Sequence, residues 1–367
     1  MSVQIAIIGA GCSGLSLAAK LAGRSDLQLS LYGPDDNRDD HIWGFWQHDH
    51  LRAAQKLARG CWHNWQIITD EECITHHSAD HPYLALSATS WLDKCRREII
   101  DLPHHKTSLP LDAALPDADI VCDSRPRPYP DGIMLQHFLG WEIQTDKPVF
   151  TPDTAILMDF RTSQAHGVHF IYLLPFSPTE ALVESTYFSS ETLDEAIYEA
   201  DIKTYLQEQL QLQSYKIMRR EAGVIPMADI AALRPAQPNH IFIGGAGGAI
   251  RPSSGYAFAF IQSQVNKLAA SLPVGHINPP HHKIDRWMDR VFLHVLTRQP
   301  HLAPTLFAVM ARRLSGDEFA RFMSGAGGMT VRIKMILAMP KFPFILAAFH
   351  CLFSAKSKSV STAGANR

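Results

Sequence analysis

A strand-like apolar run that leads directly into closely spaced glycines constrains the fold of this chain more than any other feature. Val3 to Ile8 has the composition of a buried parallel strand, and Gly9-Ala10-Gly11-Cys12-Ser13-Gly14 follows it. Leu15 to Leu21 is typical of a helix, and Leu27 to Tyr32 predicts a second strand. This order predicts a βαβ unit of the Rossmann type within an α/β fold.

The glycines and Ser13 are the first candidate binding residues. We expect Gly9 to permit the tight turn, Gly11 to let the backbone approach a pyrophosphate, and Gly14 to allow close packing of the helix against the strand. The helix N-terminus, which carries Ser13, faces the negative charge in such units. The turn therefore predicts a bound dinucleotide, whereas a glycine-rich turn without a ligand is the alternative.

The acidic residue that usually holds the ribose hydroxyls is missing from the end of the second strand, which reads Leu31-Tyr32-Gly33. Asp35 or Asp36 is the candidate substitute. Both are equally well explained as solvated turn residues after Pro34.

A second glycine-rich junction follows the predicted strand His240 to Ile243. Its candidate residues are Gly244, Gly245, Gly247 and Gly255, and a helix is expected from about residue 257 to 272. Because only glycine lets the backbone pack directly on a flat ring system, we expect this junction to complete one cofactor cradle. A plain loop is the alternative.

The middle of the chain predicts antiparallel strands over Ala155 to Phe160, Val168 to Leu174 and Ala181 to Phe188. Pro175 to Pro178 has the turn chemistry of a hairpin between the last two. We interpret this region as an inserted, mostly antiparallel substrate domain.

Composition excludes several classes of protein. A chain of 367 residues with 46% hydrophobic residues builds a large core, and its net charge of -2 gives no basic surface for nucleic acid. The 6 cysteines form no C-x-x-C pair and the 19 histidines no H-E-x-x-H motif, so no metal is expected. No signal peptide is recognised, so a cytoplasmic protein is expected.

The C-terminal part, from His281 onward, is compatible with helices. Pro340 and Pro343 interrupt its apolar end, so no run reaches the roughly 20 residues needed to span a bilayer. Phe344 to Phe353, with lysines around it, suits a helix lying in a membrane interface, and a buried core helix is the alternative. Residues 356–367 are predicted to be a disordered polar tail.

Several motifs, in order from about residue 3 to residue 350, resemble the bacterial FAD-dependent lycopene β-cyclases. These are Gly9 to Gly14; His41-Ile42-Trp43-Gly44-Phe45-Trp46, similar to N-H-T-W-x-F; Asp123-Ser124-Arg125, similar to D-x-R-G; Gln136 to Glu142; Met158 to Arg161; Leu182 to Thr186; Gly247 to Tyr256; and Arg321-Phe322-Met323.

The resemblance implies a proton-initiated, net-redox-neutral closure of a linear carotenoid end group to a β-ionone ring. It implies reduced FAD as cofactor, NAD(P)H as its reductant, an apolar carotenoid as substrate, and peripheral association with the inner membrane. Arg125 and Asp35 are then expected to contact the cofactor. Val183-Glu184-Ser185-Thr186 is similar to the family's F-L-E-E-T, so Glu184 inherits the acid role, and Ser185 replaces the second acid.

The residues themselves also favour Glu184. In a strand, Leu182, Glu184 and Thr186 share one face. If that face is buried, loss of solvation raises the pKa of the carboxyl and keeps it protonated near neutral pH, as a general acid requires. A solvent-facing glutamate is the alternative.

Aromatic side chains inside the family-like motifs, Trp43, Trp141 and Tyr256, are predicted to line the substrate tunnel. The expected domains are a discontinuous FAD-binding domain (1–45, 90–128 and 235–275), a substrate domain (46–89 and 129–234) and a C-terminal helical region (276–355).

Two other classes of function remain open. An FAD-dependent monooxygenase or isoprenoid reductase uses the same fold, although the G-D expected of such hydroxylases is replaced by Gly244-Gly245. A non-catalytic carotenoid-binding flavoprotein is the other, and in it Glu184 has no chemical role.

Overall fold

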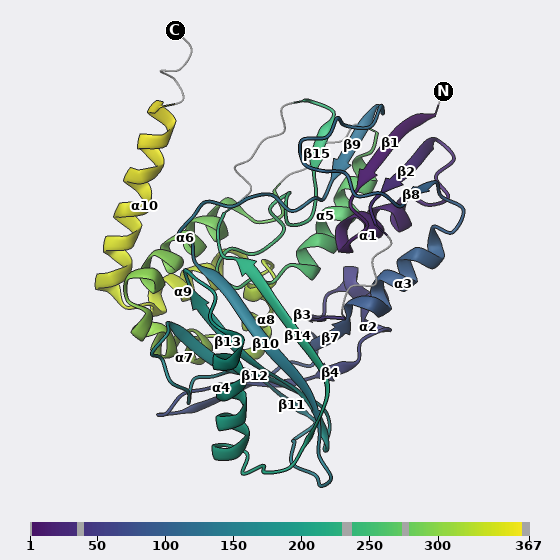
Figure 1. Cartoon of the computed structure of the whole chain (residues 1–367). Coiled ribbons are helices and arrows are strands. Elements are labelled where there is room, and N and C mark those ends of the chain that lie inside the picture. The colour runs from purple at the N-terminus through teal and green to yellow at the C-terminus, as the bar shows by residue number, and fades with distance from the viewer. Residues whose placement is uncertain (1, 35–39, 230–236, 274–278, 362–367) are drawn as a thin grey trace.

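The computed structural model describes residues 2–34, 40–229, 237–273 and 279–361, with side chains up to residue 352. Its N-terminal sheet has five parallel strands in the order β15-β9-β1-β2-β8 (Figure 1). These strands are β1 (Val3–Ile8), β2 (Leu27–Tyr32), β8 (His104–His105), β9 (Ile120–Asp123) and β15 (His240–Phe242). The predicted parallel βαβ unit is confirmed.

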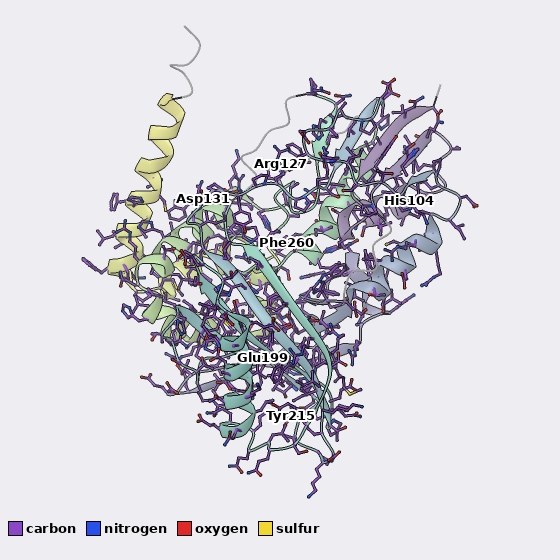
Figure 2. All side chains as sticks on the ribbon, viewed as in Figure 1. His104, Arg127, Asp131, Glu199, Tyr215 and Phe260 are labelled. Carbon is purple, nitrogen blue, oxygen red and sulfur yellow. The ribbon has the colours of Figure 1, made fainter. Side chains whose placement is uncertain are left out.

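Helix α1 (Cys12–Leu21) packs on β1 and β2 of this sheet. Helices α3 (Ala88–Glu98) and α5 (Phe258–Ser271) pack on α1. The predicted helices after both glycine-rich junctions are therefore confirmed. Ser16 joins the three, because its hydroxyl accepts hydrogen bonds from Trp91 of α3 at 2.9 Å and from Gln262 of α5 at 3.0 Å. Phe260 of α5 is labelled near the centre of the view in Figure 2, and its ring packs against His281.

A short sheet has the strand order β3-β7-β4, and β3 follows β2 in the chain. Its antiparallel strands are β3 (Ile42–Trp46), β4 (Gly60–Trp62) and β7 (Tyr83–Ser87). A 3-10 turn (Asp49–Leu51) and α2 (Arg52–Gln55) connect β3 to β4.

The second large sheet has seven strands in the order β14-β10-β13-β12-β11-β5-β6. Its strands are β5 (Asn64–Ile68), β6 (Cys73–His77), β10 (Leu135–Gln144), β11 (Thr154–Asp159), β12 (Val168–Ser177), β13 (Glu180–Ser189) and β14 (Lys216–Pro226). Every pairing is antiparallel except β11 with β5, so the predicted mostly antiparallel sheet and its β12–β13 hairpin are confirmed. Helix α4 (Glu195–Glu208) packs on β10 and β13.

Helices form the C-terminal part, as predicted. They are α6 (Lys283–Arg298), α7 (Ala303–Arg313), α8 (Gly316–Met323), α9 (Gly328–Ala338) and α10 (Lys341–Ser361), with a 3-10 turn at Pro300–Leu302. Helix α10 continues to Ser361, so the prediction of a disordered tail is wrong for residues 356–361. The outer end of α10 projects away from the rest of the molecule (Figure 1).

Candidate active site

The turn between β1 and α1 has the backbone geometry that a bound pyrophosphate needs. Gly9 has φ +102, and a Cβ on Gly14 would lie 1.8 Å from the Gly9 carbonyl oxygen, so both positions require glycine. A Cβ on Gly11 would instead meet no atom within 4 Å. Helix α1 has no side-chain cap and no acidic residue in its first turn. Its N–H groups are therefore available to an anion, and the open space at Gly11 fits the phosphates of FAD.

The second glycine-rich junction meets the first at one point. Gly244 has φ +63, and a Cβ there would lie 2.3 Å from Ser13 Oγ. Two of the other three candidates do not approach the first junction, since Gly247 approaches the Phe242 carbonyl and Gln264 of α5 and Gly245 approaches the Ile250 side chain. The structure thus brings Gly9, Gly11, Ser13, Gly14 and Gly244 together, and we call these five residues the cradle. Their role in binding FAD stays a prediction.

Arg125 lies just after the carboxyl end of β9. Its guanidinium is held by Asp123, with Nη2 donating to Oδ2 at 2.7 Å, and by the carbonyl of Leu109 at 3.2 Å. Protein groups therefore take up much of its hydrogen-bonding capacity. Asp35, the other predicted contact to FAD, lies outside the described residues.

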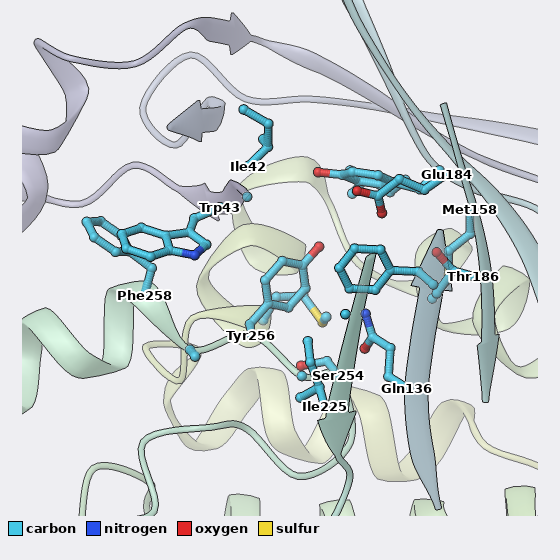
Figure 3. A pocket seen from close by; sticks show the side chains of 18 of the residues that line it. Ile42, Trp43, Gln136, Met158, Glu184, Thr186, Ile225, Ser254, Tyr256 and Phe258 are labelled. Atoms are coloured by element: carbon cyan, nitrogen blue, oxygen red, sulfur yellow. The ribbon is translucent and has the colours of Figure 1, made fainter. Parts of the chain in front are cut away.

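A cavity of about 400 Å³ lies beside this cradle, between β3, the seven-stranded sheet and helices α5, α7 and α8 (Figure 3). Trp43 and Tyr256, which were predicted to line a substrate tunnel, line this cavity, and Trp43 stacks on Phe258 with ring centroids 5.3 Å apart. Gly255 also lines it, next to Gln136. Most of the wall is aromatic or aliphatic, so the cavity suits a hydrocarbon ligand.

Four polar atoms of the cavity wall are buried without a hydrogen-bond partner among the described residues. They are Trp46 Nε1, Gln136 Oε1, Thr186 Oγ1 and Ser254 Oγ. Buried polar groups are almost always paired, so these atoms indicate a ligand with polar edges. A flavin ring has such edges, and a carotenoid hydrocarbon does not.

Glu184 of β13 is the one carboxylic acid among the described residues that line this cavity, and its side chain points into it (Figure 3). The residue is only 8% exposed. Burial, followed by the charge of the neighbouring Glu221, raises the pKa of Glu184 well above its ordinary value, and the charge of Arg219 opposes this only in part. The Leu182 face of the strand is buried, and Glu184 is placed as the sequence suggested.

Strand register explains why Glu221 lies next to Glu184. Gly140 of β10 pairs with Glu184 of β13 on one side and with Glu221 of β14 on the other. A Cβ on Gly140 would lie 2.7 Å from Cγ of Glu184 and 3.3 Å from Cγ of Glu221. Because Gly140 has no side chain, the carboxyl groups of Glu184 and Glu221 can lie next to each other over β10, the strand between β13 and β14.

Three phenols border the same space. The hydroxyl of Tyr83 lies 2.9 Å from that of Tyr172 and 3.1 Å from that of Tyr256. Burial raises the pKa of each of these tyrosines, so they are neutral hydroxyl groups. Gly44 of β3 provides their room, because a Cβ there would lie 2.0 Å from the Tyr83 hydroxyl oxygen.

Trp141 does not line the cavity, contrary to the prediction. It lies one residue after Gly140, so strand alternation turns it to the other face of the sheet, where it is buried near Tyr215 and beneath Lys203 of α4. Figure 2 labels Glu199, which belongs to α4, and Tyr215, which follows α4 in the chain.

Ser185, which replaces the second acid of the family motif, also lies behind the sheet. Its hydroxyl donates to Asp201 at 3.1 Å and lies 3.0 Å from His169 Nε2. It is therefore not in contact with the cavity that Glu184 faces. The second carboxyl near Glu184 comes from Glu221, which follows much later in the chain on β14.

A second, more apolar cavity of about 440 Å³ adjoins the first. The two share lining residues, including Ser253, Phe307 and Met323. Its other walls come from α6, α9 and α10, among them Trp287, Met335 and Phe344.

Among the residues that the structure describes, no group of three or more His, Cys, Asp or Glu side chains could hold a metal ion. Within the same residues no single helix is long and apolar enough to cross a membrane, and the pair α9 and α10 meets these criteria jointly but bends by 118°.

Comparisons with solved structures show the fold. A geranylgeranyl bacteriochlorophyll reductase-like protein from Thermoplasma acidophilum superimposes with a TM-score of 0.61 at 13% identity, covering 95% of this chain and 99% of that one. A flavin-dependent brominase gives a TM-score of 0.58 at 12% identity, covering 92% and 98%. The predicted α/β fold class is thereby confirmed.

Sequence comparison shows the family. A lycopene β-cyclase of Pantoea ananas is 26% identical, over 96% of this chain and 98% of its own length. One from a Paracoccus species is 27% identical, over 96% and 97%. The sequence profile described as "Lycopene cyclase protein" matches residues 4–103 and 109–349. Because these matches extend over nearly the whole chain, the protein belongs to the lycopene cyclase family.

Proposed function

We propose that this protein is an FAD-dependent lycopene β-cyclase in which Glu184 is the general acid. The observation that carries the proposal is a buried carboxyl in an otherwise apolar cavity, next to a glycine cradle that fits FAD, and burial raises the pKa of this carboxyl well above its ordinary value. The named activity of the Pantoea and Paracoccus relatives supports the same substrate class.

In this proposal Glu184 gives its proton to the terminal alkene of a linear carotenoid. Protonation creates a carbocation, so the site must exclude water and stabilise positive charge. The aromatic faces of Trp43 and Tyr256 are suited to that role, and the apolar wall keeps solvent out. FAD, when bound in its electron-rich reduced form, would supply negative charge that stabilises the cation.

The cradle residues hold the cofactor. The N-terminus of α1 and Gly11 would hold the phosphates, and Gln136, Thr186 and Ser254 would offer their unpaired atoms to a polar ring edge. NAD(P)H enters the proposal only as the external reductant of the flavin, since the isomerisation itself consumes no electrons.

We propose further that the second cavity holds the remainder of the polyene and that its helices contact the membrane surface. Exposed apolar side chains gather on α9 and α10, including Ile333, Phe342, Leu346 and Phe349. A contiguous apolar surface of this kind marks a membrane or protein interaction site. A carotenoid dissolved in a bilayer would then enter between these helices.

The test is expression in lycopene-accumulating cells with chromatography of the pigments. Wild-type protein is expected to form β-rings, and Glu184→Gln to form less than about 1% as much, because the amide cannot donate the proton (a loss of roughly 3 kcal/mol or more). Glu208→Gln, an exposed position of α4, is the matched control and should keep full activity.

Two outcomes contradict the proposal. One is β-ring formation by Glu184→Gln at the wild-type rate. The other is oxygen uptake, or consumption of NAD(P)H in proportion to product, which would identify a monooxygenase or a reductase instead.

A further inference from the structure

The contact between Glu184 and Glu221 places two buried carboxyl groups where only one can be ionised without a large penalty. The Glu221 side chain is 1% exposed. Two adjacent carboxyls in such a site share one proton, because two like charges at this distance repel strongly in a poorly solvated environment.

The surroundings decide which carboxyl carries the negative charge. Arg219 Nη1 donates to Glu221 Oε2 at 2.6 Å, and the backbone N–H of Ile42 donates to the same oxygen at 3.2 Å. Glu221 Oε1 is buried and has no donor within the described part of the chain. A protonated Glu184 is therefore the group in position to donate to it.

Arg219 is itself anchored. Its Nε donates to Glu142 at 3.2 Å, and Arg59 Nη1 donates to the same carboxylate at 2.7 Å. Burial favours a protonated Glu142, but the hydrogen bonds and charge of Arg59, together with a hydrogen bond from Arg219, outweigh it and lower the pKa of Glu142 to about 2. Glu142 thus stays anionic and holds the Arg219 guanidinium against Glu221.

We infer that Glu184 and Glu221 share a single proton across Gly140, and that Glu221 is the positioning residue that lets Glu184 act first as acid and then as base. Glu221 does not line the substrate cavity and acts through Glu184. This inference rests on the proposed cyclase function.

The proton balance follows directly. The O–H bond of Glu184 breaks as a C–H bond forms on the terminal alkene, and the resulting cation closes the ring by a new C–C bond. Both carboxyls are then anions next to a cation. Their mutual repulsion makes Glu184 a stronger base, and it removes one proton from the ring carbon next to the cation, which forms the ring double bond. The pair ends with one proton, as it began.

The test is the pH dependence of turnover by purified, flavin-loaded protein. Only protonated Glu184 starts the reaction, so the rate falls as pH rises through its pKa. The charged or titratable groups that face the Glu184–Glu221 pair are Arg219 from β14, Tyr172 from β12, Tyr83 from β7, Tyr256 before α5 and His41 at the cavity edge.

Glu221→Gln removes the neighbouring negative charge. The alkaline limb of the pH–rate profile, in which the rate falls as pH rises, should therefore move to lower pH by about one pH unit or more. Glu221→Asp keeps the charge and should leave the limb near its wild-type position. Arg219→Gln removes the opposing positive charge and should move the limb to higher pH. Bound flavin, measured by absorbance, reports whether each variant is folded.

An alkaline limb that stays in place in folded Glu221→Gln overturns the inference. If Glu221→Gln does not fold, Arg219→Gln provides the test. An alkaline limb that does not move to higher pH in that variant also overturns the inference. A wild-type protein that forms no cyclic product contradicts the proposed function, so the two failures are distinguishable.

Discussion

At the scale of single residues, Gly140 determines whether the two carboxyls can coexist. Gly140→Ala places a methyl group 2.7 Å from Cγ of Glu184. Overpacking of this kind costs about 1–3 kcal/mol, and we expect that loss of unfolding free energy in urea together with a drop in cyclisation of at least roughly tenfold. Glu184→Ala in the same chain removes the obstructing atom. The double variant should therefore regain stability, and strictly additive losses would contradict the proposed contact.

Trp141 provides the opposite prediction, because it lies behind the sheet. Trp141→Ala should lower the free energy of unfolding by about 3–5 kcal/mol, since it empties a fully buried site. Turnover per folded molecule should stay within about twofold of wild type at a temperature where the variant is folded. Turnover that falls much further would show that Trp141 influences the cavity from behind.

At the scale of elements, two substitutions in the β1–α1 turn are expected to affect different properties, one FAD binding and the other the stability of the apoprotein. Gly11→Ala points a methyl group into open space, so the apoprotein should unfold within about 0.5 kcal/mol of wild type while FAD binds at least roughly tenfold more weakly. Gly14→Ala is the comparison, because its methyl group would strike the Gly9 carbonyl and should destabilise the apoprotein itself. Titration with FAD and urea unfolding measure the two effects. Unchanged FAD affinity in Gly11→Ala would contradict the cradle.

Local sequence patterns were enough to predict two parts of the site. The β1–α1 turn was predicted from composition and glycine spacing, and the shared face of Leu182 and Glu184 was predicted from period-2 alternation. The same alternation turns Ser185 to the face opposite Glu184, and Trp141 to the face opposite Gly140. A motif match does not show which face of the sheet each residue occupies. The prediction that Trp141 lines the cavity failed for this reason.

Glu221 was missed because its place depends on a long-range pairing. It joins Glu184 only through the register of β14 on β10 and of β10 on β13, strands that lie far apart in sequence. The alternation Arg219-x-Glu221-x-Gly223 could have predicted a strand with both charges on one face. No local signal could have given its partner.

At the scale of the whole molecule, the C-terminal helices carry the proposed membrane contact. Replacing Phe342, Leu346 and Phe349 together by serine should abolish sedimentation with phospholipid vesicles, because it removes exposed apolar area from α10. Bound FAD should be unchanged. Ile100→Ser, an equally exposed apolar site next to α3, is the control and should not alter sedimentation. Vesicle binding that survives the triple replacement would assign the contact to another surface.

The most direct test of the account is the source of the hydrogen that enters the ring. Reduced, flavin-loaded protein is given lycopene in deuterium oxide, and the product is examined by mass spectrometry and NMR. Because the Glu184 carboxyl exchanges with solvent before the substrate binds, we predict a deuterium on the protonated carbon of the new β-ring, and no ring formation with Glu184→Gln. Rings that form without solvent deuterium during the first turnover would contradict proton delivery by Glu184.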